Sequence, residues 1–437
     1  MEPVDTLIFA KWILPVVPSE LVLEDHAVAI QAGTIKAILT ADEAEKITAA
    51  QVIRLENHIL IPGLINAHGH APMTLLRGIA DDIPLQAWLE EHIWPLEGKF
   101  VSEEFVYDGA LLATAEMIRS GTTCFADMYF FPEQVARAAL EGQMRVQLAS
   151  PVLDFPTVWA QDAEDYIGKS TALHDAYRNN ELISTAFGPH APYTVSDEPL
   201  RKISMLAEEL DVPIHMHVHE TGQEIVDSVN SHGKRPLKRL QDLGLLTPRL
   251  NCIHVTQVQS DEITALADNG VNVIHCPQSN LKLASGFCEI AKLAGAGVNV
   301  ALGTDGCASN NDLDMLAEMQ TAALLAKAVA NDASAIPAHQ ALARATINGA
   351  RALGLQDSIG SLEVGKRADI AALDMGALNA LPMFQPHSQL VYSTISSQVS
   401  HVWCNGVNLL FESELQTLDR TLLENIAMRW QQKIIAA

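Results

Sequence analysis

Positive charge is scarce in this sequence. Among 437 residues, 28 are Lys or Arg and 53 are Asp or Glu, which gives a formal net charge of −25, and no run of basic residues occurs. Nucleic acids and anionic membrane surfaces bind proteins through clustered positive charge. We therefore expect neither a nucleic acid nor a membrane as a partner.

Long apolar runs, a leader and paired cysteines are also missing. No unbroken apolar stretch reaches the length of about 20 residues that spans a bilayer, and Met1–Asp5 lack the positive region that opens a signal peptide. The six cysteines are scattered without a Cys-x-x-Cys pair, as is usual in a reducing compartment. These features predict a cytoplasmic protein with buried thiols.

The short motifs of nucleotide and serine chemistry are absent too. We find no Gly-x-x-x-x-Gly-Lys-Ser/Thr, no Gly-x-Gly-x-x-Gly after a strand and no Gly-x-Ser-x-Gly. ATP hydrolysis, dinucleotide redox chemistry and serine-based hydrolysis therefore have no support. A hydrophobic content of 48% is nevertheless ample for a large core.

The middle of the chain alternates strand-like and helix-like segments. Helical patterns such as Glu103–Arg119, Pro199–Leu210 and Ser260–Asn269 lie between apolar runs. Eight such alternations predict a (β/α)8 barrel, an α/β fold whose active site lies at the carboxyl ends of the strands. The expected strands are Leu60–Asn66, Thr122–Met128, Val146–Leu153, Ser184–Phe187, Val212–His217, Asn251–Val255, Val271–His275 and Val298–Gly303.

Strand-like segments without intervening helices precede this barrel. Short strands are expected at Leu21–Leu23, Ala27–Ile30 and Thr34–Leu39, and Glu24–His26 is expected as a turn. Because similar segments follow the barrel, the two chain ends could pair into one small β-sandwich.

After about residue 335 we expect a helix over Ala338–Arg351, a strand within Gly360–Leu373, a hairpin at Val402–Val407 with an Asn-Gly turn, and a short terminal helix. The predicted units are residues 1–59 and 361–437 for the sandwich and terminal helix, and residues 60–360 for the barrel.

Two histidines follow the first expected barrel strand. The apolar run Ile59–Ile61 leads through Pro-Gly to His68 and His70, which are one residue apart. Alternation puts both side chains on one face of an extended segment, where two imidazoles can bind one metal ion. His217, His254 and Asp305 end later apolar runs in the same way.

Periodicity cannot choose among His215, His217 and His219, because alternation places all three on one face. His215 has apolar neighbours and is assigned to the core, whereas His219 could lie behind the metal ligands or line the pocket. We take His217 as one of four metal ligands, because imidazole and carboxylate suit zinc, iron or nickel. The set is His68, His70, His217 and Asp305.

Glu220 lies just past the strand that ends at His217. A carboxylate beside a metal-bound water is suited to carry protons, because the metal lowers the pKa of that water toward about 7. The sequence therefore predicts Glu220 as the proton carrier.

With these motifs the sequence resembles the amidohydrolase superfamily, and within it the 5-methylthioadenosine/S-adenosylhomocysteine deaminase family. The similarity covers nearly the whole chain and implies a distorted TIM barrel with a composite β-sandwich, assembled as a homo-oligomer of two or more subunits. The segments that carry it are Pro62–Gly78, Phe187–Tyr193, His217–Thr221, His275–Gly286, Leu302–Asn310 and Gly365–Ile370.

The resemblance also implies roles for single residues. His254 and Asp305 would orient the water and take its proton, while Glu220 protonates the ring nitrogen beside the amino-bearing carbon, so that ammonia leaves. The expected fourth strand lacks the lysine that binuclear relatives carboxylate, so one zinc ion per subunit, or one iron ion, is expected. The metal ligands implied are again His68, His70, His217 and Asp305, and the substrate contacts are Trp88, Glu97, His190, Glu220 and Ser309.

Two other functions stay open. Relatives with the same metal set act on guanine, cytosine or s-triazine rings, although a ribose-binding Glu97 favours a nucleoside over a free base. A metal-binding scaffold without catalysis is the second alternative, but it would have no need to keep Glu220, His254 and Asp305 together.

The stretch after the third expected strand indicates which 5′ substituent the substrate carries. In the family, arginines there hold the carboxylate of S-adenosylhomocysteine, whereas Ala149–Asp162 contains no Arg or Lys. Two acidic residues would repel a carboxylate and three bulky apolar residues suit a thiomethyl group. These are Asp154 and Asp162, and Phe155, Val158 and Trp159.

The predicted reaction is therefore deamination of 5′-methylthioadenosine to 5′-methylthioinosine and ammonia, with S-adenosylhomocysteine or adenosine as weaker substrates. The alternative is that Arg145 or a distant basic residue supplies the charge that this stretch lacks.

Overall fold

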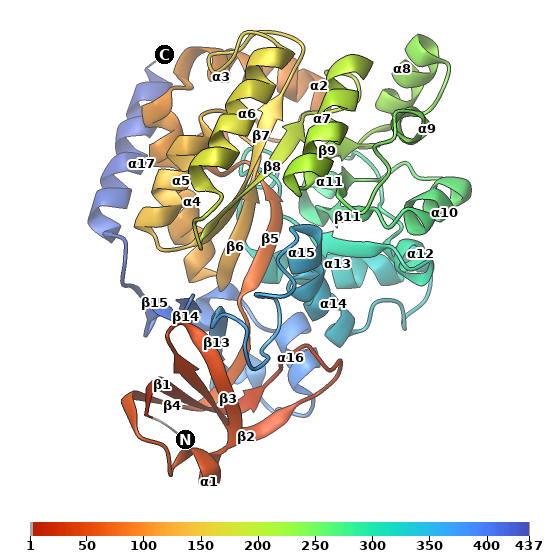
Figure 1. Ribbon diagram of the computed structural model, residues 1–437. Coiled ribbons are helices and arrows are strands. Elements are labelled where there is room, and N and C mark those ends of the chain that lie inside the picture. Colours follow the sequence, from red (N-terminus) through yellow and green to blue (C-terminus); the bar gives the residue numbers. More distant parts are fainter. Residues whose placement is uncertain (1–2, 437) are drawn as a thin grey trace.

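The computed structural model describes residues 3–436, which contain two eight-stranded sheets (Figure 1). Met1 and Glu2, at the start where no signal peptide is expected, and Ala437 lie outside the described residues. Within residues 3–436, each helix is too short or too polar to cross a membrane.

One sheet is the predicted parallel barrel. Its strands follow one another in sequence order around the barrel. The barrel closes where Gly69 forms a parallel bridge with Asp305, and the Asp305 N–H donates to the His68 carbonyl over 3.0 Å. All eight expected strands are present, and the α/β barrel is confirmed. The strands are β5 (Leu64–Gly69), β6 (Thr122–Asp127), β7 (Arg145–Val152), β8 (Ile183–Pro189), β9 (Ile214–Val218), β10 (Leu250–His254), β11 (Asn272–His275) and β12 (Asn299–Leu302).

Helices surround these strands and begin at recognisable caps. Helix α4 spans Glu103–Arg119, as predicted, and the Ser102 side chain accepts a hydrogen bond from the Phe105 N–H at its start. Helix α7 (Asp197–Leu210) begins two residues before the predicted start, and α10 (Ser260–Asp268) ends one residue before the predicted end. The other helices of this part are α5 (Pro132–Glu141), α6 (Ala163–Tyr177), α8 (Gly222–His232), α9 (Pro236–Asp242), α11 (Pro277–Lys282), α12 (Ile290–Gly295), α13 (Met315–Ala330), α14 (Ala338–Arg344) and α15 (Ile347–Ala352).

Short helical pieces connect β5 to α4 over the carboxyl end of the barrel. One of them is a π-helix, a rare form that is frequent at functional sites. The pieces are η1 (Ala71–Leu76), α2 (Leu85–Ala87), the π-helix η2 (Trp88–Ile93) and α3 (Trp94–Phe100).

The second sheet is built from both ends of the chain, as predicted. Its order is β16-β15-β14-β13-β4-β1-β2-β3, and the antiparallel pairing of β4 with β13 joins the two ends, with Ile61 opposite Ala371. One of its faces encloses an apolar cluster that includes Ile8, Ile370 and Trp403. The strands are β1 (Val4–Ile13), β2 (Leu23–Gln31), β3 (Thr34–Thr40), β4 (Ala49–Pro62), β13 (Ile370–Asp374), β14 (Val399–Cys404), β15 (Val407–Phe411) and β16 (Glu414–Leu415). Short helices α1 (Ala41–Ala44), η3 (Leu378–Ala380), α16 (Pro386–Tyr392) and η4 (Ser396–Gln398) connect them.

Several details of the chain ends were predicted wrongly. Glu24–His26 is not a turn but part of β2, because β2 lies between β1 and β3 and keeps its backbone pairing, with Glu24 opposite Trp12, even where its side chains are polar. Leu21–Leu23 is not a separate strand, since only Leu23 belongs to β2. The long strand β1 and the first half of β4 were not singled out.

At the other end, the expected helix Ala338–Arg351 is two helices, α14 and α15, because Thr346 departs from helical geometry at φ −136°, ψ −98°. The Asn405-Gly406 hairpin turn is confirmed, with both residues at positive φ. The terminal helix α17 (Arg420–Ile435) is 16 residues long rather than short. It packs beside α4 (Figure 1), where Trp430 Nε1 donates to Asp108 over 2.7 Å.

A single residue, Gly63, separates β4 of one sheet from β5 of the other. A Cβ atom on Gly63 would lie 2.1 Å from the Thr123 hydroxyl oxygen, so a side chain there would push β5 away from β6. The Pro-Gly step thus lets the first barrel strand approach its neighbour and sets the position of the histidines at its end. The predicted unit limits at residues 59/60 and 360/361 stay predictions.

Candidate active site

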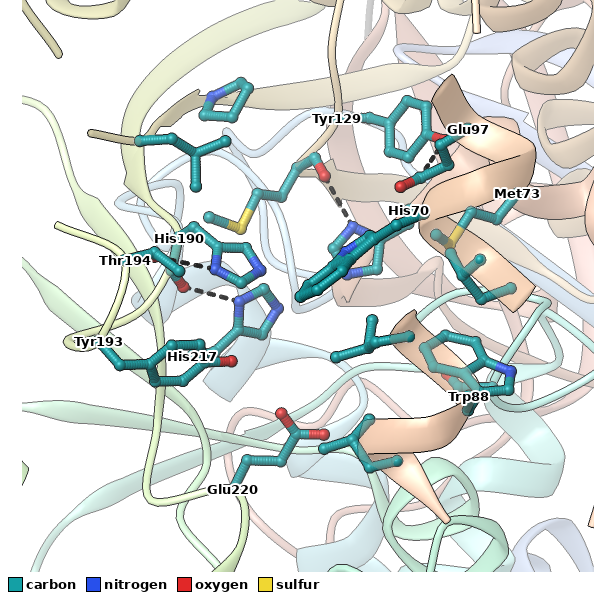
Figure 2. A pocket seen from close by; sticks show the side chains of 18 of the residues that line it. His70, Met73, Trp88, Glu97, Tyr129, His190, Tyr193, Thr194, His217 and Glu220 are labelled. Carbon is teal, nitrogen blue, oxygen red and sulfur yellow. Dashed lines mark hydrogen bonds between the residues drawn. The ribbon is translucent and has the colours of Figure 1, made fainter. Parts of the chain in front are cut away.

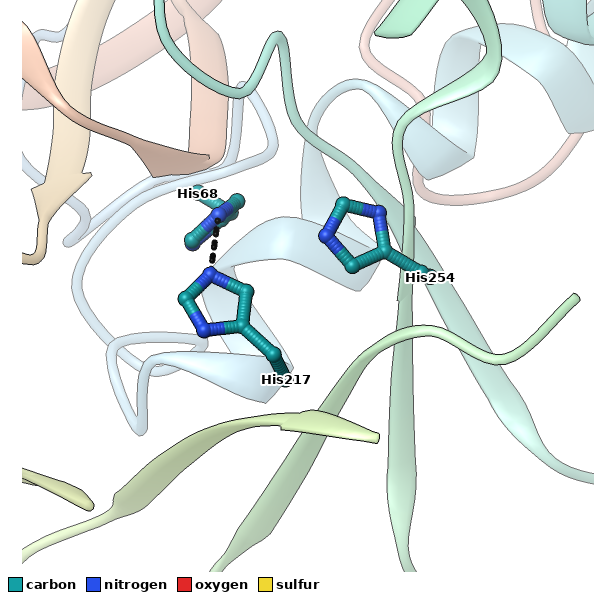
Figure 3. A group of neighbouring side chains, drawn as sticks. All are labelled: His68, His217 and His254. Atoms are coloured by element: carbon teal, nitrogen blue, oxygen red, sulfur yellow. Dashed lines mark hydrogen bonds between the residues drawn. The ribbon is translucent and has the colours of Figure 1, made fainter. Parts of the chain in front are cut away.

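Four side chains at the carboxyl ends of barrel strands lie around one point. Asp305 Oδ1 is 3.4 Å from His68 Nε2 and 3.3 Å from His70 Nε2. His217 Nε2 is 3.3 Å from His68 Nε2. The structure therefore brings together the four residues that the sequence proposed as metal ligands. Together with His254 they form two overlapping groups of potential ligand atoms, one with His68, His70 and Asp305 and one with His68, His217 and His254 (Figure 3).

The hydrogen bonds of these rings fit a bound cation. His70 Nδ1 is 2.7 Å from the Met128 carbonyl and His217 Nδ1 is 2.8 Å from the His190 carbonyl. A carbonyl only accepts, so both Nδ1 atoms carry a hydrogen, and the Nε2 atoms are the ones that face the other ligands. Two imidazole nitrogens and a carboxylate that face a common centre are the donor set of a divalent metal, and carbonyls behind metal-binding histidines fix the tautomer in this way.

The protonation states of the four side chains also bear on metal binding. Burial lowers the pKa of His68 to about 4, and burial also holds the pKa of His217 well below its usual value, so both rings are neutral. Burial alone would raise the pKa of Asp305, but hydrogen bonds to His68 and His70 hold it well below its usual value. His70 differs: burial alone would lower its pKa, but its hydrogen bond to Asp305 raises the pKa to about 9, so a bound cation would displace a proton from this ring.

Two serines hold the Asp305 carboxylate from behind. Ser279 and Ser309 hydroxyls donate to its Oδ2 over 2.6 and 2.9 Å. Ser309 was predicted as a substrate contact and lines the cavity described below, yet its hydroxyl is used on Asp305. Ser279, fully buried in α11, was missed. The only available signal was its place in the His275–Gly286 stretch.

The two histidines that flank His217 in the sequence behave differently from each other. His215 Nε2 is 2.9 Å from His68 Nδ1, so His215 supports a proposed ligand rather than merely filling the core. His219 accepts a hydrogen bond from the Leu237 N–H, away from the centre. The reason is that β9 ends at Val218 and His219 adopts φ +56°, which breaks the alternation.

His254 and Glu220 complete the centre. His254 Nε2 is 3.8 Å from Glu220 Oε1, while its Nδ1 is 2.9 Å from the Asn280 side-chain oxygen and so carries the hydrogen. Burial raises the pKa of Glu220. A carboxyl group with a raised pKa beside an imidazole that presents a lone pair can accept and donate a proton.

A cavity of about 720 Å³ opens above this centre (Figure 2). Trp88 and Glu97 line it from the π-helix and from α3, as the sequence predicted for substrate contacts. Glu97 accepts a hydrogen bond from the Tyr129 hydroxyl over 2.5 Å, and burial raises the pKa of Glu97. Tyr129, at the end of β6, was not predicted.

His190 lines the opposite wall, also as predicted (Figure 2). Its Nδ1 is 3.1 Å from the Thr194 hydroxyl, and burial lowers its pKa to about 4. The ring is therefore neutral, and its Nε2 remains for a ligand in the cavity.

The charged groups of the wall are almost all acidic. Glu97, Glu220, Glu224, Asp227 and Asp305 line the cavity. Among the described side chains of its wall, none belongs to Lys or Arg. The cavity is therefore unfavourable for a ligand that carries a free carboxylate.

Only some of the residues predicted in the loop after β7 line the cavity. Phe155 and Val158 line the cavity, but Trp159 is buried against Tyr166. The acidic residues of this stretch do not line it. Asp154 accepts from the Ser196 N–H and Asp162 caps α6, so the repulsion expected from them has to come from the acidic residues named above.

Arg145, the predicted alternative source of positive charge, is at the wrong end of its strand. It begins β7 and forms an ion pair with Asp369 over 3.2 Å. Seven steps of about 3.3 Å separate it from the strand end that faces the cavity.

Comparison with known proteins identifies relatives over the whole chain. The amidohydrolase family matches residues 59–409. A 5-methylthioadenosine/S-adenosylhomocysteine deaminase from Teredinibacter turnerae is 53% identical over 99% of this chain and 98% of its own length. A 5′-deoxyadenosine deaminase from Methanothermobacter thermautotrophicus is 41% identical over 92% of this chain and 91% of its own.

A solved structure is similar as well. It is an adenosine deaminase from Xanthomonas campestris with bound zinc, 49% identical, and the two chains cover each other completely with a TM-score of 0.99.

Proposed function

We propose, because this chain belongs to the amidohydrolase family, that it hydrolyses the amino group of adenine nucleosides and releases ammonia. It is a hydrolytic deaminase with an α/β barrel and a composite sheet from both chain ends. The observation that carries this proposal is the placement of Glu220 and His254, 3.8 Å apart, beside the His and Asp cluster in one cavity.

We propose one divalent metal ion per subunit, zinc or iron, held by the four residues around the common centre. The relative from Xanthomonas campestris has bound zinc, and the Nε2 atoms of His68 and His70 beside ionised Asp305 support the same kind of ion here. Strand β8 ends at Pro189 without a lysine, which supports one ion rather than two. The proposed ligands are His68, His70, His217 and Asp305.

The chain's own residues then have distinct tasks. A metal bound at the centre would supply a water whose pKa is lowered toward about 7. Asp305 and the lone pair of His254 orient that water and accept its proton. Glu220, whose pKa is raised by burial, donates a proton to the ring nitrogen beside the amino-bearing carbon. The water oxygen bonds to that carbon, and the carbon–nitrogen bond breaks as the amino group takes the proton that Asp305 and His254 accepted and leaves as ammonia. The second proton of the water returns to Glu220.

A nucleoside fits this cavity better than a free base. Glu97 is buried in the wall with one oxygen on Tyr129, and its second oxygen remains for the ribose hydroxyls. A carboxylate is a strong acceptor for two neighbouring hydroxyl groups. Guanine, cytosine and s-triazine rings carry no ribose and would leave the second oxygen of Glu97 without a ligand hydroxyl.

The preferred nucleoside is 5′-methylthioadenosine. Phe155 and Val158 offer an apolar wall for a thiomethyl group, whereas the carboxylate of S-adenosylhomocysteine would meet acidic side chains without a Lys or Arg in the described wall. Losing a charge-assisted pair costs about 1.5–3 kcal/mol, so the preference in kcat/KM should be about tenfold to a hundredfold.

The test is ammonia release from methylthioadenosine, S-adenosylhomocysteine, adenosine and guanine, each with and without a chelator. We expect turnover of all three nucleosides, with the highest kcat/KM for methylthioadenosine, and no turnover of guanine. The chelator should abolish all activity. Turnover of guanine above that of the nucleosides would overturn the proposal.

The predicted homo-oligomer and the cytoplasmic location stay predictions. Light scattering of the purified protein would measure the number of subunits, and a dimer or larger assembly is expected.

A further inference from the structure

We propose that Glu224 is a positioning residue that fixes Glu220 for proton transfer by holding the backbone on which Glu220 sits. The two oxygens of Glu224 each accept one backbone hydrogen bond, Oε1 from the His219 N–H over 2.9 Å and Oε2 from the Glu220 N–H over 2.7 Å. The inference rests on the proposed function, because it needs Glu220 as the proton donor.

The same two residues are held from their other side by Thr256. The Thr256 N–H donates to the His219 carbonyl over 2.9 Å, and its hydroxyl donates to the Glu220 carbonyl over 2.7 Å. The backbone of residues 219 and 220 thus lies between a carboxylate from α8 and a hydroxyl from the segment after β10. Together these contacts fix both its position and its orientation.

The backbone at this point needs such support. His219 adopts φ +56°, a left-handed conformation that is strained for a non-glycine residue. An extended β9 would carry the next side chains past the strand end instead of turning Glu220 toward His254. The Glu224 carboxylate stabilises the turned conformation, because only there do two successive N–H groups point at one carboxylate.

A role limited to capping α8 does not explain this arrangement. The cap of α8 is Thr221, whose hydroxyl already accepts from the Glu224 N–H. The Glu224 carboxylate also interacts with the Thr221 backbone, as in a capping box, but its hydrogen bonds to the N–H groups of residues 219 and 220 lie beyond the cap. Its side chain is 8% exposed, and a buried carboxylate is retained only where its hydrogen bonds compensate for the lost water.

Three sets of kinetic measurements test the inference on the metal-loaded full-length protein. Glu224→Gln replaces one acceptor oxygen by an amide NH2 that cannot face a backbone N–H. Glu224→Asp is one methylene shorter and reaches at most one of the two N–H groups. We expect both variants to keep their metal content and KM within a few-fold, and to lose about 10- to 100-fold in kcat, the loss typical of a misplaced reacting group.

The control is Asp369→Asn. Asp369 is 3% exposed, pairs with Arg145 and accepts a backbone N–H from Asn405 over 2.7 Å, but it does not line the cavity. We expect Asp369→Asn to lower the melting temperature as Glu224→Gln does, while kcat changes less than twofold. Equal kcat losses in the two variants would show that burial of a carboxylate, not positioning, is responsible.

The decisive measurement is a double-mutant cycle with Glu220→Gln. If Glu224 acts through Glu220, adding Glu224→Gln to Glu220→Gln should change kcat less than about twofold. The pH dependence of kcat that Glu220 gives the wild type should also be absent from Glu220→Gln and shifted in Glu224→Gln.

A loss of 10-fold or more on adding Glu224→Gln to the Glu220→Gln variant would overturn the inference, as would wild-type kcat in Glu224→Gln. If Glu220→Gln itself keeps wild-type activity, the proposed function of Glu220 fails instead, so the two failures are distinguishable.

Discussion

The Tyr129 hydroxyl donates a 2.5 Å hydrogen bond to Oε1 of Glu97, and this contact joins the end of β6 to the segment that covers the cavity. Glu97 lies in α3, directly after the π-helix that carries Trp88. Both residues of the pair line the cavity. The bond leaves one oxygen of Glu97 for a ligand, and it ties the covering segment to a rigid barrel strand.

Tyr129→Phe should therefore weaken the binding of ribonucleosides while the chemistry of the ring stays intact. Loss of one hydrogen bond to a charged group is worth about 1.5–3 kcal/mol, so we expect KM for methylthioadenosine to rise by about tenfold or more and kcat to change little. Steady-state kinetics measure both constants. An unchanged KM would mean that Glu97 is held without Tyr129.

Glu220→Gln should keep the fold and the metal but lose most turnover. The amide cannot supply the proton that the ring nitrogen needs, and general acid–base help is typically worth about 10²–10⁴-fold in kcat. Circular dichroism and elemental analysis establish that fold and metal are retained. A kcat within a few-fold of wild type would remove Glu220 from the proposed mechanism.

His217→Ala and Asp305→Ala should each lower the bound metal. Each removes one of the four converging ligands, and the remaining three hold the ion less tightly. Elemental analysis of the purified variants measures the loss, and His401→Phe, which replaces a buried histidine of the other sheet, should keep the wild-type metal content. Full metal occupancy in both alanine variants would contradict the ligand assignment.

His401 should make the protein less stable in mild acid. Burial, with a smaller effect of His58, lowers the pKa of His401 to about 4 from 6.5. The folded state disfavours the protonated ring, so its contribution is fully present above pH 6.5 and is lost as the pH falls toward 4. Between pH 7.5 and 5 this amounts to about 2 kcal/mol at most.

His401→Phe keeps a ring in the stack with Trp403, 5.6 Å between centroids, but cannot be protonated. Melting temperatures at pH 7.5 and 5 should therefore fall further for the wild type than for this variant. An equal fall in both would show that other groups account for the acid sensitivity.

Much of the site could be predicted from the sequence because barrel geometry collects strand ends. His68, His70, His217 and Asp305 each follow a short apolar run, and parallel strands bring such positions to one face of the barrel. Alternation failed at His219, because the residue after a strand can turn to positive φ without a signal in residue type.

The residues that support the site could not be predicted in this way. Ser279, Glu224 and Tyr129 act through contacts with residues that are, respectively, 26, 4 and 32 positions away in the sequence. Only the folded chain fixes those pairs. The terminal sheet was predicted less well. β1 was missed although Leu7–Ala10 is a continuous apolar run, whereas the first half of β4 is largely exposed and is a strand through its pairing with β1.

The preference for methylthioadenosine can be tested by adding the charge that the cavity lacks. Val158 lines the cavity and is 52% exposed at its mouth, so a longer side chain has room there without disturbing the core. An arginine pairs with a carboxylate through two parallel hydrogen bonds. Val158→Arg should therefore raise the ratio of kcat/KM for S-adenosylhomocysteine to that for methylthioadenosine by about tenfold or more.

The control for this change is Val158→Met, which lengthens the side chain without adding charge and should leave the ratio within about twofold of the wild type. Raising the salt concentration should reduce the gain of the arginine variant, because exposed ion pairs are screened. If the methionine variant shifts the ratio as much as the arginine variant does, the shape of the loop and not its charge selects the 5′ substituent. If neither variant shifts it, the carboxylate does not reach this wall, and the selectivity has to arise nearer to Asp227 and Glu224, the acidic residues that line the cavity from α8.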